Sequence, residues 1–582
     1  MRAVKGRRWR RPRVRAIALP VLACGMLLGC AQKNDLDRRF VVSGIEQVDS
    51  PLGSYLAGRY ARSARDTKSA VQFFTAALAE DPNNTGLQHR TFLLLLADGR
   101  IEEAIALADG LLANQNTSAM AEILLAVDAV RQGLYSDAAS QLGEPPERGF
   151  GALLKPLILA WSAAGEGQRE VALKMLDELS DREAFAAFRT YHAALILDFL
   201  GDTDGARQAY AKFRDEHGIS TASALAYGSF LRRHGEPQAA ETIYAELLAR
   251  AADSPSVLQA VVDLEAERPA PPYVASANEG VGEALYSAAG ALARERGGDA
   301  ARIYVHLALY LRPEFDPARV LLGEILELDR RWEEAIAVYE KVPQTSPYYL
   351  ETRIRIAANL DRLDALDKAV EVLNALATQR PEETTAIISL GDLLRSHKRY
   401  SEAAQAYDRA LARVNEPQER HWGLFYARGV ALERSHEWDR AEADFLKALE
   451  LYPDHPLVLN YLGYSWVEQG RHLDRALSMI EKAVEQRPND GYIVDSLGWV
   501  LYQLKDFEGA VAQLERAVEL KPQDPVINDH LGDAYWQVGR RLEARFQWRH
   551  ALGLEPEEAE IPKIKAKLEK GLTSVASNER QR

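Results

Sequence analysis

Residues 456–488 read PLVLNYLGYSWVEQGRHLDRALSMIEKAVEQRP, and the same pattern is written twice more before residue 556. Each copy has Leu-Gly, two alanines seven residues apart and a closing proline. The matched positions are Leu462-Gly463, Leu497-Gly498 and Leu531-Gly532; Ala476, Ala510 and Ala544; Ala483, Ala517 and Ala551; Pro488, Pro522 and Pro556. The Leu-Gly pairs lie 35 and 34 residues apart and the alanines 34. A period of this length predicts a helix-turn-helix repeat that stacks into a solenoid.

The residue types of this pattern have a physical reason. Leucine fills the core side of the first helix, and glycine is expected where the neighbouring helix passes too close for a side chain. Alanines seven residues apart share one face of the second helix and allow a close helix crossing. Proline cannot continue the helix and ends it. A single helix pair buries too little apolar surface to be stable alone, so one good repeat predicts others.

The first of the two alanines traces the repeat back through the chain. It recurs at Ala70, Ala104, Ala138, Ala172, Ala206 and Ala240, then at Ala301, Ala335, Ala369 and Ala403, and then at Ala441, Ala476, Ala510 and Ala544. Most steps are 34 residues, and glycines and prolines keep the same offsets, as Gly58, Gly228, Pro313 and Pro381 do. The sequence therefore predicts fourteen repeats.

This pattern closely resembles the tetratricopeptide repeat over residues 54–556. The resemblance implies an all-α fold, a right-handed superhelical solenoid of about 14 helix-turn-helix repeats whose first helices line a concave face. We expect six repeats in residues 53–252, a break at 253–280, eight repeats in 281–556, and a capping helix and tail in 557–582.

The step from Ala240 to Ala301 is 61 residues and contains three prolines in four positions, which cannot be helical. One interpretation of residues 253–280 is a linker or a degraded repeat. The other is an ordered loop that packs into the groove of the solenoid and shapes a binding site. A second irregularity, four extra residues near 415–417, indicates a longer turn between helices.

Residues 559–571 form an amphipathic pattern, with Ile561, Ile564 and Leu568 at helical spacing and lysines elsewhere. A solenoid needs such a cap because its last repeat would otherwise expose its stacking face. A partner-binding or membrane-surface helix is the alternative.

Composition excludes several functions for the 582-residue chain. Its net charge is -14, and without the eight Arg and Lys of residues 1–15 it would be -22. Such an acidic body argues against binding nucleic acid and against lying flat on an anionic membrane. The two cysteines are Cys24 and Cys30, so the rest of the chain has no disulfide framework, zinc knuckle or thiol nucleophile.

The N-terminal residues predict a secretion signal followed by a membrane anchor. Residues 1–15 are basic and residues 16–29 are apolar, which is typical of a signal peptide. The following Leu27-Leu28-Gly29-Cys30-Ala31 resembles the bacterial lipobox. That resemblance implies a lipoprotein signal peptide in residues 1–29 and lipidation of Cys30, and Ala31 favours sorting to the outer membrane. A plain signal peptide or an uncleaved anchor is the alternative.

Residues 31–52 are polar and mixed in charge, so we expect a flexible tether after the lipidated Cys30. About twenty flexible residues reach roughly 25 Å. The body would then lie at the periplasmic face of the outer membrane, held by its N-terminal lipid.

No segment matches a phosphate-binding loop, a serine nucleophile elbow, a zinc-protease helix or a calcium loop. The histidines are scattered, and we expect them to be surface or capping residues. The sequence therefore predicts a protein that is not an enzyme and has neither a metal site nor a cofactor.

Binding of protein or peptide partners is better supported. In tetratricopeptide arrays the first helices line the inner wall. The resemblance places these candidates there: Asn460, Tyr464, Tyr492, Asp495, Trp499, Tyr502, Asp529, Asp533 and Trp536. Aromatic surfaces beside hydrogen-bonding side chains suit a peptide groove. The alternative is that Trp499, Tyr502 and Trp536 only pack adjacent helices.

Some arrays of this family grip a terminal carboxylate with Lys, Arg and Asn at these positions. The candidates include Asn460 but no Lys or Arg, so we expect a larger protein surface or an extended segment as ligand.

The whole plan resembles the large tetratricopeptide lipoproteins of Gram-negative envelopes, through the lipobox, the long acidic array and the runs at 461–466 (YLGYSW) and 527–536 (INDHLGDAYW). These lipoproteins include the adaptor of a periplasmic carboxyl-terminal processing protease, which presents cell-wall hydrolases to it. The resemblance implies a non-enzymatic, membrane-anchored scaffold or adaptor in the periplasm. The alternative is an assembly or export factor for pili, exopolysaccharide or outer-membrane proteins. The sequence leaves the partner and the oligomeric state open.

Overall fold

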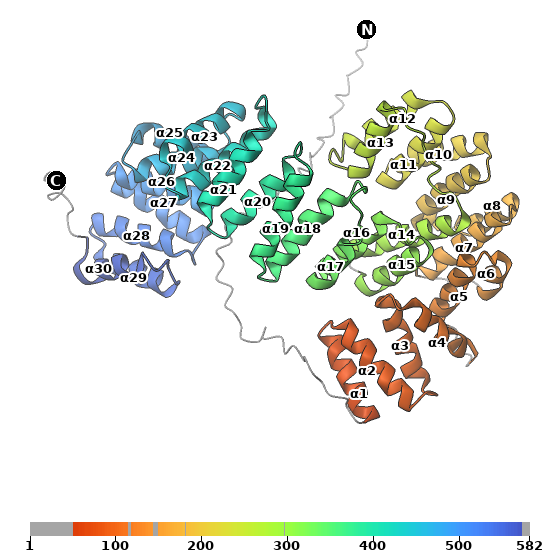
Figure 1. Ribbon diagram of the computed structural model, residues 1–582. Helices are drawn as coiled ribbons and strands as arrows, with labels where there is room; N and C mark the ends of the chain where they lie inside the picture. Colours follow the sequence, from red (N-terminus) through yellow and green to blue (C-terminus); the bar gives the residue numbers. More distant parts are fainter. Residues whose placement is uncertain (1–49, 114–117, 144–148, 181, 296, 573–582) are drawn as a thin grey trace, which may run out of the picture.

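A computed structural model describes residues 50–572 except for 114–117, 144–148, 181 and 296. The described part of the chain is all helical, with 30 α-helices, two short 3-10 helices and no strand. The helices run antiparallel in pairs that stack side by side into two curved arrays (Figure 1). This is the solenoid that the sequence predicted.

The first thirteen helices form the N-terminal curve in Figure 1. They are α1 (Pro51–Ser63), α2 (Thr67–Glu80), α3 (Thr85–Ala97), α4 (Ile101–Ala113), α5 (Ala119–Arg131), α6 (Tyr135–Gln141), α7 (Gly151–Gly165), α8 (Arg169–Asp177), α9 (Ala186–Phe199), α10 (Thr203–His217), α11 (Thr221–Arg233), α12 (Pro237–Leu248) and α13 (Pro255–Glu265), with the 3-10 helix η2 (Glu183–Phe185) before α9.

The chain continues through α14 (Ala277–Arg294), α15 (Gly298–Leu311), α16 (Asp316–Leu328) and α17 (Trp332–Tyr339). The remaining helices are α18 (Tyr349–Arg362), α19 (Leu366–Gln379), α20 (Thr385–Ser396), α21 (Tyr400–Leu411), η3 (Glu419–His421), α22 (Trp422–Arg434), α23 (Trp438–Leu451), α24 (Pro456–Glu468), α25 (Leu473–Gln486), α26 (Gly491–Gln503), α27 (Phe507–Leu520), α28 (Pro525–Gln537), α29 (Arg541–Gly553) and α30 (Ile561–Lys570).

The alanine that defines the repeat is fully buried in every copy. All fourteen, from Ala70 to Ala544, have an exposed fraction of 0%. A methyl group is the largest side chain that fits where the two helices of a pair cross so closely. The phase inferred from the sequence is therefore the phase of the structure.

The glycine of each pair makes room for a side chain rather than for a helix backbone. A Cβ atom built on Gly323 would lie 2.2 Å from the ring of Tyr339, and one on Gly532 would lie 2.4 Å from the ring of Trp548. In both cases the ring stands four residues after the buried alanine of the second helix. The same holds at the other repeat glycines, with Phe74, Tyr244, Tyr407, Phe445, Ile480 and Leu514 as the partners.

Short polar residues start many helices, and left-handed residues end the first helix of each pair. The carboxylate of Asp66 accepts a hydrogen bond from the backbone N–H of Ser69 at 2.9 Å and so caps α2. The turn after α3 uses Gly99 at φ +76°, a conformation that glycine adopts without strain. The corresponding turn after α20 holds Lys398 at φ +60°.

The groove of the N-terminal array is filled by the protein's own helices. α14 packs on α5, α7 and α9, and α15 packs on α3, α4 and α5. The inner wall there is apolar and buried, as Val127, Leu157 and Trp161 show at 0% exposure. A Cβ on Gly280 of α14 would lie 2.2 Å from the Trp161 ring. This groove therefore serves as a core and not as an open binding surface.

Hydrogen bonds between residues far apart in the sequence also hold α15 and the start of α17 against the N-terminal helices. The Tyr310 hydroxyl of α15 donates to Asp128 of α5 at 2.6 Å. The guanidinium of Arg331, just before α17, donates to the Thr67 hydroxyl of α2 at 3.1 Å. Residues more than 180 positions apart are thus joined, which adjacent-repeat stacking alone does not do.

Residues 253–280 are ordered along the inner wall of the sixth repeat. They begin with α13, which packs on α11 and α12 as a further first helix would. Arg232 of α11 donates to the carbonyl oxygens of Asp263 and Arg268 at 3.0 and 2.6 Å, and the Ser229 hydroxyl donates to that of Pro271. The helix α13 has the place of a degraded repeat and the residues after it contact Ser229 and Arg232 of α11, so the contacts of this segment are with the chain itself.

The hydrophobic core continues across this segment. One cluster of buried hydrophobic residues runs from Val71 to Ile356, and the next begins at Ala357. The division of the sequence into six and eight repeats at 253–280 is therefore not a division of the core. α14 to α17 share the core of the N-terminal array.

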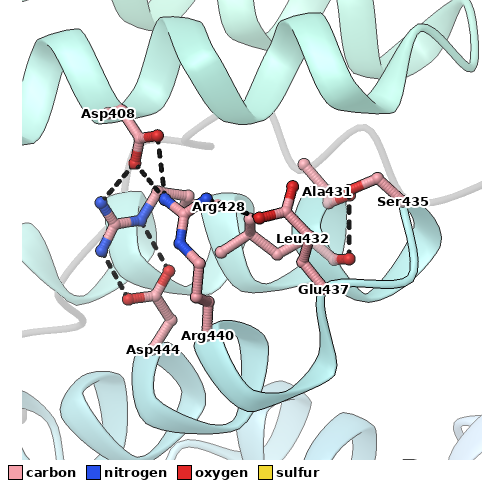
Figure 2. A network of polar contacts seen from close by, with 8 residues as sticks. All are labelled: Asp408, Arg428, Ala431, Leu432, Ser435, Glu437, Arg440 and Asp444. Carbon is pink, nitrogen blue, oxygen red and sulfur yellow. Dashed lines mark hydrogen bonds and ion pairs between the residues drawn. The ribbon is translucent and has the colours of Figure 1, made fainter.

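A polar clamp joins α21, α22 and α23 near the four extra residues of the second irregularity (Figure 2). The Arg428 guanidinium donates to Asp408 at 2.7 Å and to Asp444 at 2.6 and 2.7 Å. Arg440 donates to both carboxylate oxygens of Asp408, at 2.8 and 2.9 Å, and to Glu437 at 2.8 Å. Burial raises the pKa of Asp444, and Arg428 opposes that rise. The clamp fixes the stacking angle of these repeats after the longer turn.

The C-terminal repeats curve until their ends approach each other. Lys398, in the turn before α21, lies 3.7 Å from Glu557, which follows α29. After Glu557 the chain enters α30, which packs on α29. The last helix therefore lies at the mouth of the C-terminal groove.

Candidate partner-binding site

The inner wall of the last complete repeats is built by α24, α26 and α28, which are the first helices of their pairs. Their stacking side is set by Leu462, Leu497 and Leu531, all buried. The opposite face of each helix carries the candidate residues and lies toward the groove. Three features occupy this wall: an aromatic stack, a buried charge cluster and a set of half-buried tyrosines.

Trp499 of α26 is the centre of the aromatic stack. Its ring lies parallel to Tyr502, with centroids 4.9 Å apart and planes at 4°, and to His530 of α28, at 4.1 Å and 14°. Its indole N–H donates to Glu468 of α24 at 2.6 Å. Trp499 thus joins three first helices and stays half-buried. It packs adjacent helices and also presents ring surface to the groove.

His530 is buried between this stack and Asp495. Its Nδ1 lies 3.0 and 3.2 Å from the two carboxylate oxygens of Asp495. Burial disfavours the charged ring, but the Asp495 carboxylate outweighs it, so the pKa of His530 is raised. The expectation of surface or capping histidines is wrong for His530, because Trp499 and Asp495 enclose it. It is also wrong for His192, which has 0% exposure and accepts a hydrogen bond from the Trp161 indole at 3.0 Å.

Lys567 of α30 enters the same wall from the end of the solenoid. Its ammonium group donates to Asp529 and to Asp533, each at 2.7 Å. Burial raises the pKa of Asp533, and Lys567 opposes that rise. The Asp533 carboxylate also accepts from the Trp548 indole at 2.8 Å. Two of the predicted binding carboxylates are therefore already paired with a lysine of the same chain, although Oδ1 of Asp529 is buried without a hydrogen-bond partner.

α30 takes the place of the first helix of a fifteenth repeat. Ala566 follows Gly532 by 34 residues, the spacing of the repeat glycines. It is exposed, whereas Gly532 is buried beneath Trp548, because no second helix follows α30 within the described residues. Ile564 is buried at 1% exposure against the core of the last repeat. The amphipathic segment thus forms the cap that the sequence predicted.

Trp536 lies under this cap. A Cβ on Gly571, just after α30, would stand 2.0 Å from the Trp536 ring, so the backbone there rests on the indole. The ring is also 5.4 Å from that of Trp548. Trp536 therefore serves mainly to hold the cap.

The remaining candidates lie toward the open part of the wall. Tyr492 is 40% exposed at the rim, with the Lys521 ammonium 5.0 Å from its ring centroid. Tyr464 is half-buried, and burial together with Glu468 and Asp495 raises the pKa of its hydroxyl. The side-chain oxygen of Asn460 is buried without a hydrogen-bond partner. These three side chains and the Trp499 stack form the part of the predicted wall that the cap leaves accessible.

Sequence reasoning placed the wall but missed the residues that organise it. Counted with the repeat glycine as position eight, positions two, five, nine and twelve of the first helix are the inner positions. His530 and Lys567 were absent from the candidates because neither stands at one of these four positions of a complete repeat. The spacing of Ala566 from Gly532 is the signal that could have identified Lys567 as an inner residue. Cys30, the predicted lipidation site, lies outside the described residues.

Carboxylates line the inner positions of the preceding repeats as well. They are Glu324, Glu327, Glu351, Asp361, Asp392 and Glu433. Arg355 binds the first three at 2.7 to 3.0 Å, and the Tyr461 hydroxyl donates to Glu433 at 3.1 Å. From α16 onward the inner positions therefore carry acidic and aromatic side chains among apolar ones, in contrast to the more uniformly apolar wall of the preceding repeats.

None of the helices in the described ranges combines the length and apolarity needed to cross a bilayer. Those ranges also hold no group of three or more histidine, cysteine or acidic side chains arranged to bind a metal ion.

The architecture and the inner wall define a class: a helical repeat solenoid with one groove filled by its own chain and a second wall that carries partly exposed aromatic and acidic side chains. Sequence models of the tetratricopeptide repeat match residues 61–127, 191–255, 318–344, 359–416, 426–490 and 498–539. The repeats of this chain are tetratricopeptide repeats.

Relatives share only parts of the chain. TPR repeat-containing protein PA4667 of Pseudomonas aeruginosa is 24% identical over 189 residues, which is 32% of this chain and 31% of that protein. The general transcriptional corepressor ssn6 of Schizosaccharomyces pombe is 24% identical over 139 residues, 24% of this chain and 12% of that protein. Among solved structures, the Cut9–Hcn1 assembly of the APC/C has a TM-score of 0.37 at 14% identity, covering 90% of this chain and 97% of that one.

Proposed function

We propose that this protein is a membrane-anchored scaffold of the Gram-negative periplasm that binds protein partners in the groove of its C-terminal repeats. Tetratricopeptide repeats are protein-interaction modules. One observation carries the choice of groove: the N-terminal wall is covered by α14 and α15, whereas Tyr492, Tyr464 and Trp499 remain partly exposed on the C-terminal wall.

The chemistry of the wall suggests which partner surfaces fit. Half-buried aromatic rings offer large rigid contacts that lose little conformational entropy on binding. The surrounding carboxylates favour a partner with basic or amide donors. Lys567 shows such a pairing, because its ammonium group donates to Asp529 and Asp533 together.

The anchoring part of the proposal rests on the sequence before residue 50. The lipobox predicts that Cys30 carries acyl chains, and two or more chains hold a protein durably on a membrane. Mass spectrometry of the mature N-terminus tests this directly, and an unmodified Cys30 contradicts it.

Co-purification from detergent-solubilised envelopes tests the scaffold. We expect Tyr492→Ala to weaken recovery of a stoichiometric partner by about tenfold or more, as for an aromatic side chain that the partner buries. Leu446→Ala is the matched control, since Leu446 is 38% exposed on α23 and Tyr492 is 40% exposed. Equal recovery by the two variants contradicts the proposed groove.

The identity of the partners separates this proposal from its alternative. Soluble hydrolases or a processing protease among the captured proteins support an adaptor. Cross-links to integral outer-membrane subunits support an assembly or export factor instead.

A further inference from the structure

The first helix of the solenoid exposes a stripe of large apolar side chains. Leu52, Leu56 and Tyr60 are 67%, 53% and 63% exposed. They are spaced four residues apart, so they follow one line along α1. Ser54, Gly58 and Ala61 lie on the buried side of the same helix, which packs on α2. The stripe therefore faces outward from the end of the array.

The same end of the molecule is basic. Arg59 and Arg62 are exposed on α1, Arg65 follows it, and α1 contains no acidic residue. Asp66, which caps α2, and Asp329, 3.9 Å from Arg65, are the acidic groups that the structure places beside these arginines. An apolar line flanked by arginines contrasts with a body whose net charge, without residues 1–15, is -22.

The position of α1 in the chain suggests what covers the stripe. α1 begins at Pro51, twenty-one residues after Cys30. About twenty flexible residues reach roughly 25 Å. α1 is therefore the described helix closest in sequence to Cys30, so a lipid there would bring it to the membrane. Figure 1 places it at the far end of the N-terminal curve.

We propose that α1 rests on the surface of an anionic lipid bilayer. Leu52, Leu56 and Tyr60 enter the boundary between headgroups and acyl chains, where apolar side chains and the amphipathic tyrosine ring are stable. Arg59 and Arg62 lie against the anionic headgroups. The acidic remainder of the solenoid is repelled from the same surface, so the array stands away from the membrane on this helix. The inference rests on the proposed membrane location.

The test uses the full chain with Cys24→Ser, purified in detergent after processing and reconstituted into phosphatidylglycerol–phosphatidylethanolamine vesicles. A bimane fluorophore is attached at Leu56→Cys or, as control, at Leu446→Cys on α23. Acylation of Cys30, read from the mass of the N-terminus, leaves the introduced cysteine as the labelled thiol. Quenching by nitroxide lipids then reports contact with the bilayer.

We expect quenching at position 56 to exceed that at 446 by about threefold or more. Arg59→Glu with Arg62→Glu should reduce the difference, because the charge then repels the headgroups. Equal quenching at 56 and 446 in an acylated chain overturns the α1 proposal and leaves the anchor intact. Cross-linking between two position-56 cysteines without quenching also overturns it and assigns the stripe to a second copy of the chain.

An unmodified Cys30 contradicts the anchor, and the α1 contact is then measured on the Cys30→Ser chain with the same vesicles and labels. Quenching confined to position 56 supports the α1 contact without the anchor. No quenching at that position overturns both.

Discussion

At the scale of single residues, each repeat pairs a small residue of its first helix with a large side chain of its second helix, and in most repeats with a glycine this side chain is an aromatic ring. Gly323→Ala places a Cβ 2.2 Å from the Tyr339 ring, and overpacking of this kind costs about 1–3 kcal/mol. Gly423→Ala is the matched control, since nothing lies within 4 Å of its Cβ position and alanine favours a helix over glycine by about 0.5–1 kcal/mol. Urea unfolding of the two variants should shift in opposite directions. Equal shifts would show that the Tyr339 ring moves aside without cost.

The buried Glu283 of α14 predicts a pH dependence of the closed N-terminal groove. It has 0% exposure and accepts from Tyr273 and Ser287, each at 3.2 Å, with Tyr191 at 3.5 Å and Arg312 at 3.9 Å. Burial raises its pKa from 4.5 to about 7, against the opposing effect of Arg312. The folded chain binds this proton more tightly, so the stabilisation is present below pH 4.5 and is lost as the pH rises toward 7.

Hydrogen exchange of the α14 amides measures this effect locally. Corrected for intrinsic rates, their opening free energy should fall by about 2 kcal/mol between about pH 5.5 and about pH 7.5. Glu283→Gln should abolish the fall, and Glu295→Gln at the exposed end of α14 should retain it. A fall that persists in Glu283→Gln points to another titrating group.

Single-residue patterns also mark the limit of sequence reasoning. The alanines were found because one small residue is required at every crossing. The large partner on the second helix was missed because Phe, Tyr, Trp, Ile and Leu all fill the space beside the glycine, so no single letter recurs. His530 was misjudged because its burial depends on Trp499 and Asp495 of the neighbouring repeat, which no local pattern encodes.

At the scale of helices, the clamp around Arg428 decides how two repeats stack. Asp444 is 4% exposed, so Arg428→Met leaves a buried carboxylate without its cation. Loss of one partner of a buried ion pair costs about 3–5 kcal/mol. Arg440→Met is the control, because the Arg440 side chain is 47% exposed and exposed pairs contribute at most about 1 kcal/mol.

Because a solenoid unfolds in local units, hydrogen exchange of α22 and α23 is the suitable measurement for this pair of variants. Faster exchange is expected in Arg428→Met alone. A comparable loss of protection in both variants would mean that the exposed bridge to Asp408 contributes as much as the buried one.

At the scale of the whole molecule, the sequence predicted the number and phase of the repeats but not which groove is open. A 34-residue period encodes contacts between neighbours, whereas the packing of α15 on α3 joins helices some two hundred residues apart. One signal was available: inner positions such as Val127, Leu157 and Trp161 are apolar in the N-terminal repeats, whereas acidic and aromatic residues stand among the apolar ones in the C-terminal repeats. An apolar inner wall predicts a covered groove.

The shared core then predicts where the chain can be divided. A chain of residues 50–265 lacks α14 and α15, and its inner wall would expose residues that are fully buried in the whole protein, including Leu96, Leu154 and Trp161. Exposed apolar surface of that extent causes association. A chain of residues 50–348 retains α14 to α17 and should be monomeric in sedimentation, whereas 50–265 should aggregate or bind a hydrophobic dye. A monomeric 50–265 chain with low dye binding would instead place the boundary in residues 253–280 and make α14 and α15 removable occupants of the N-terminal groove.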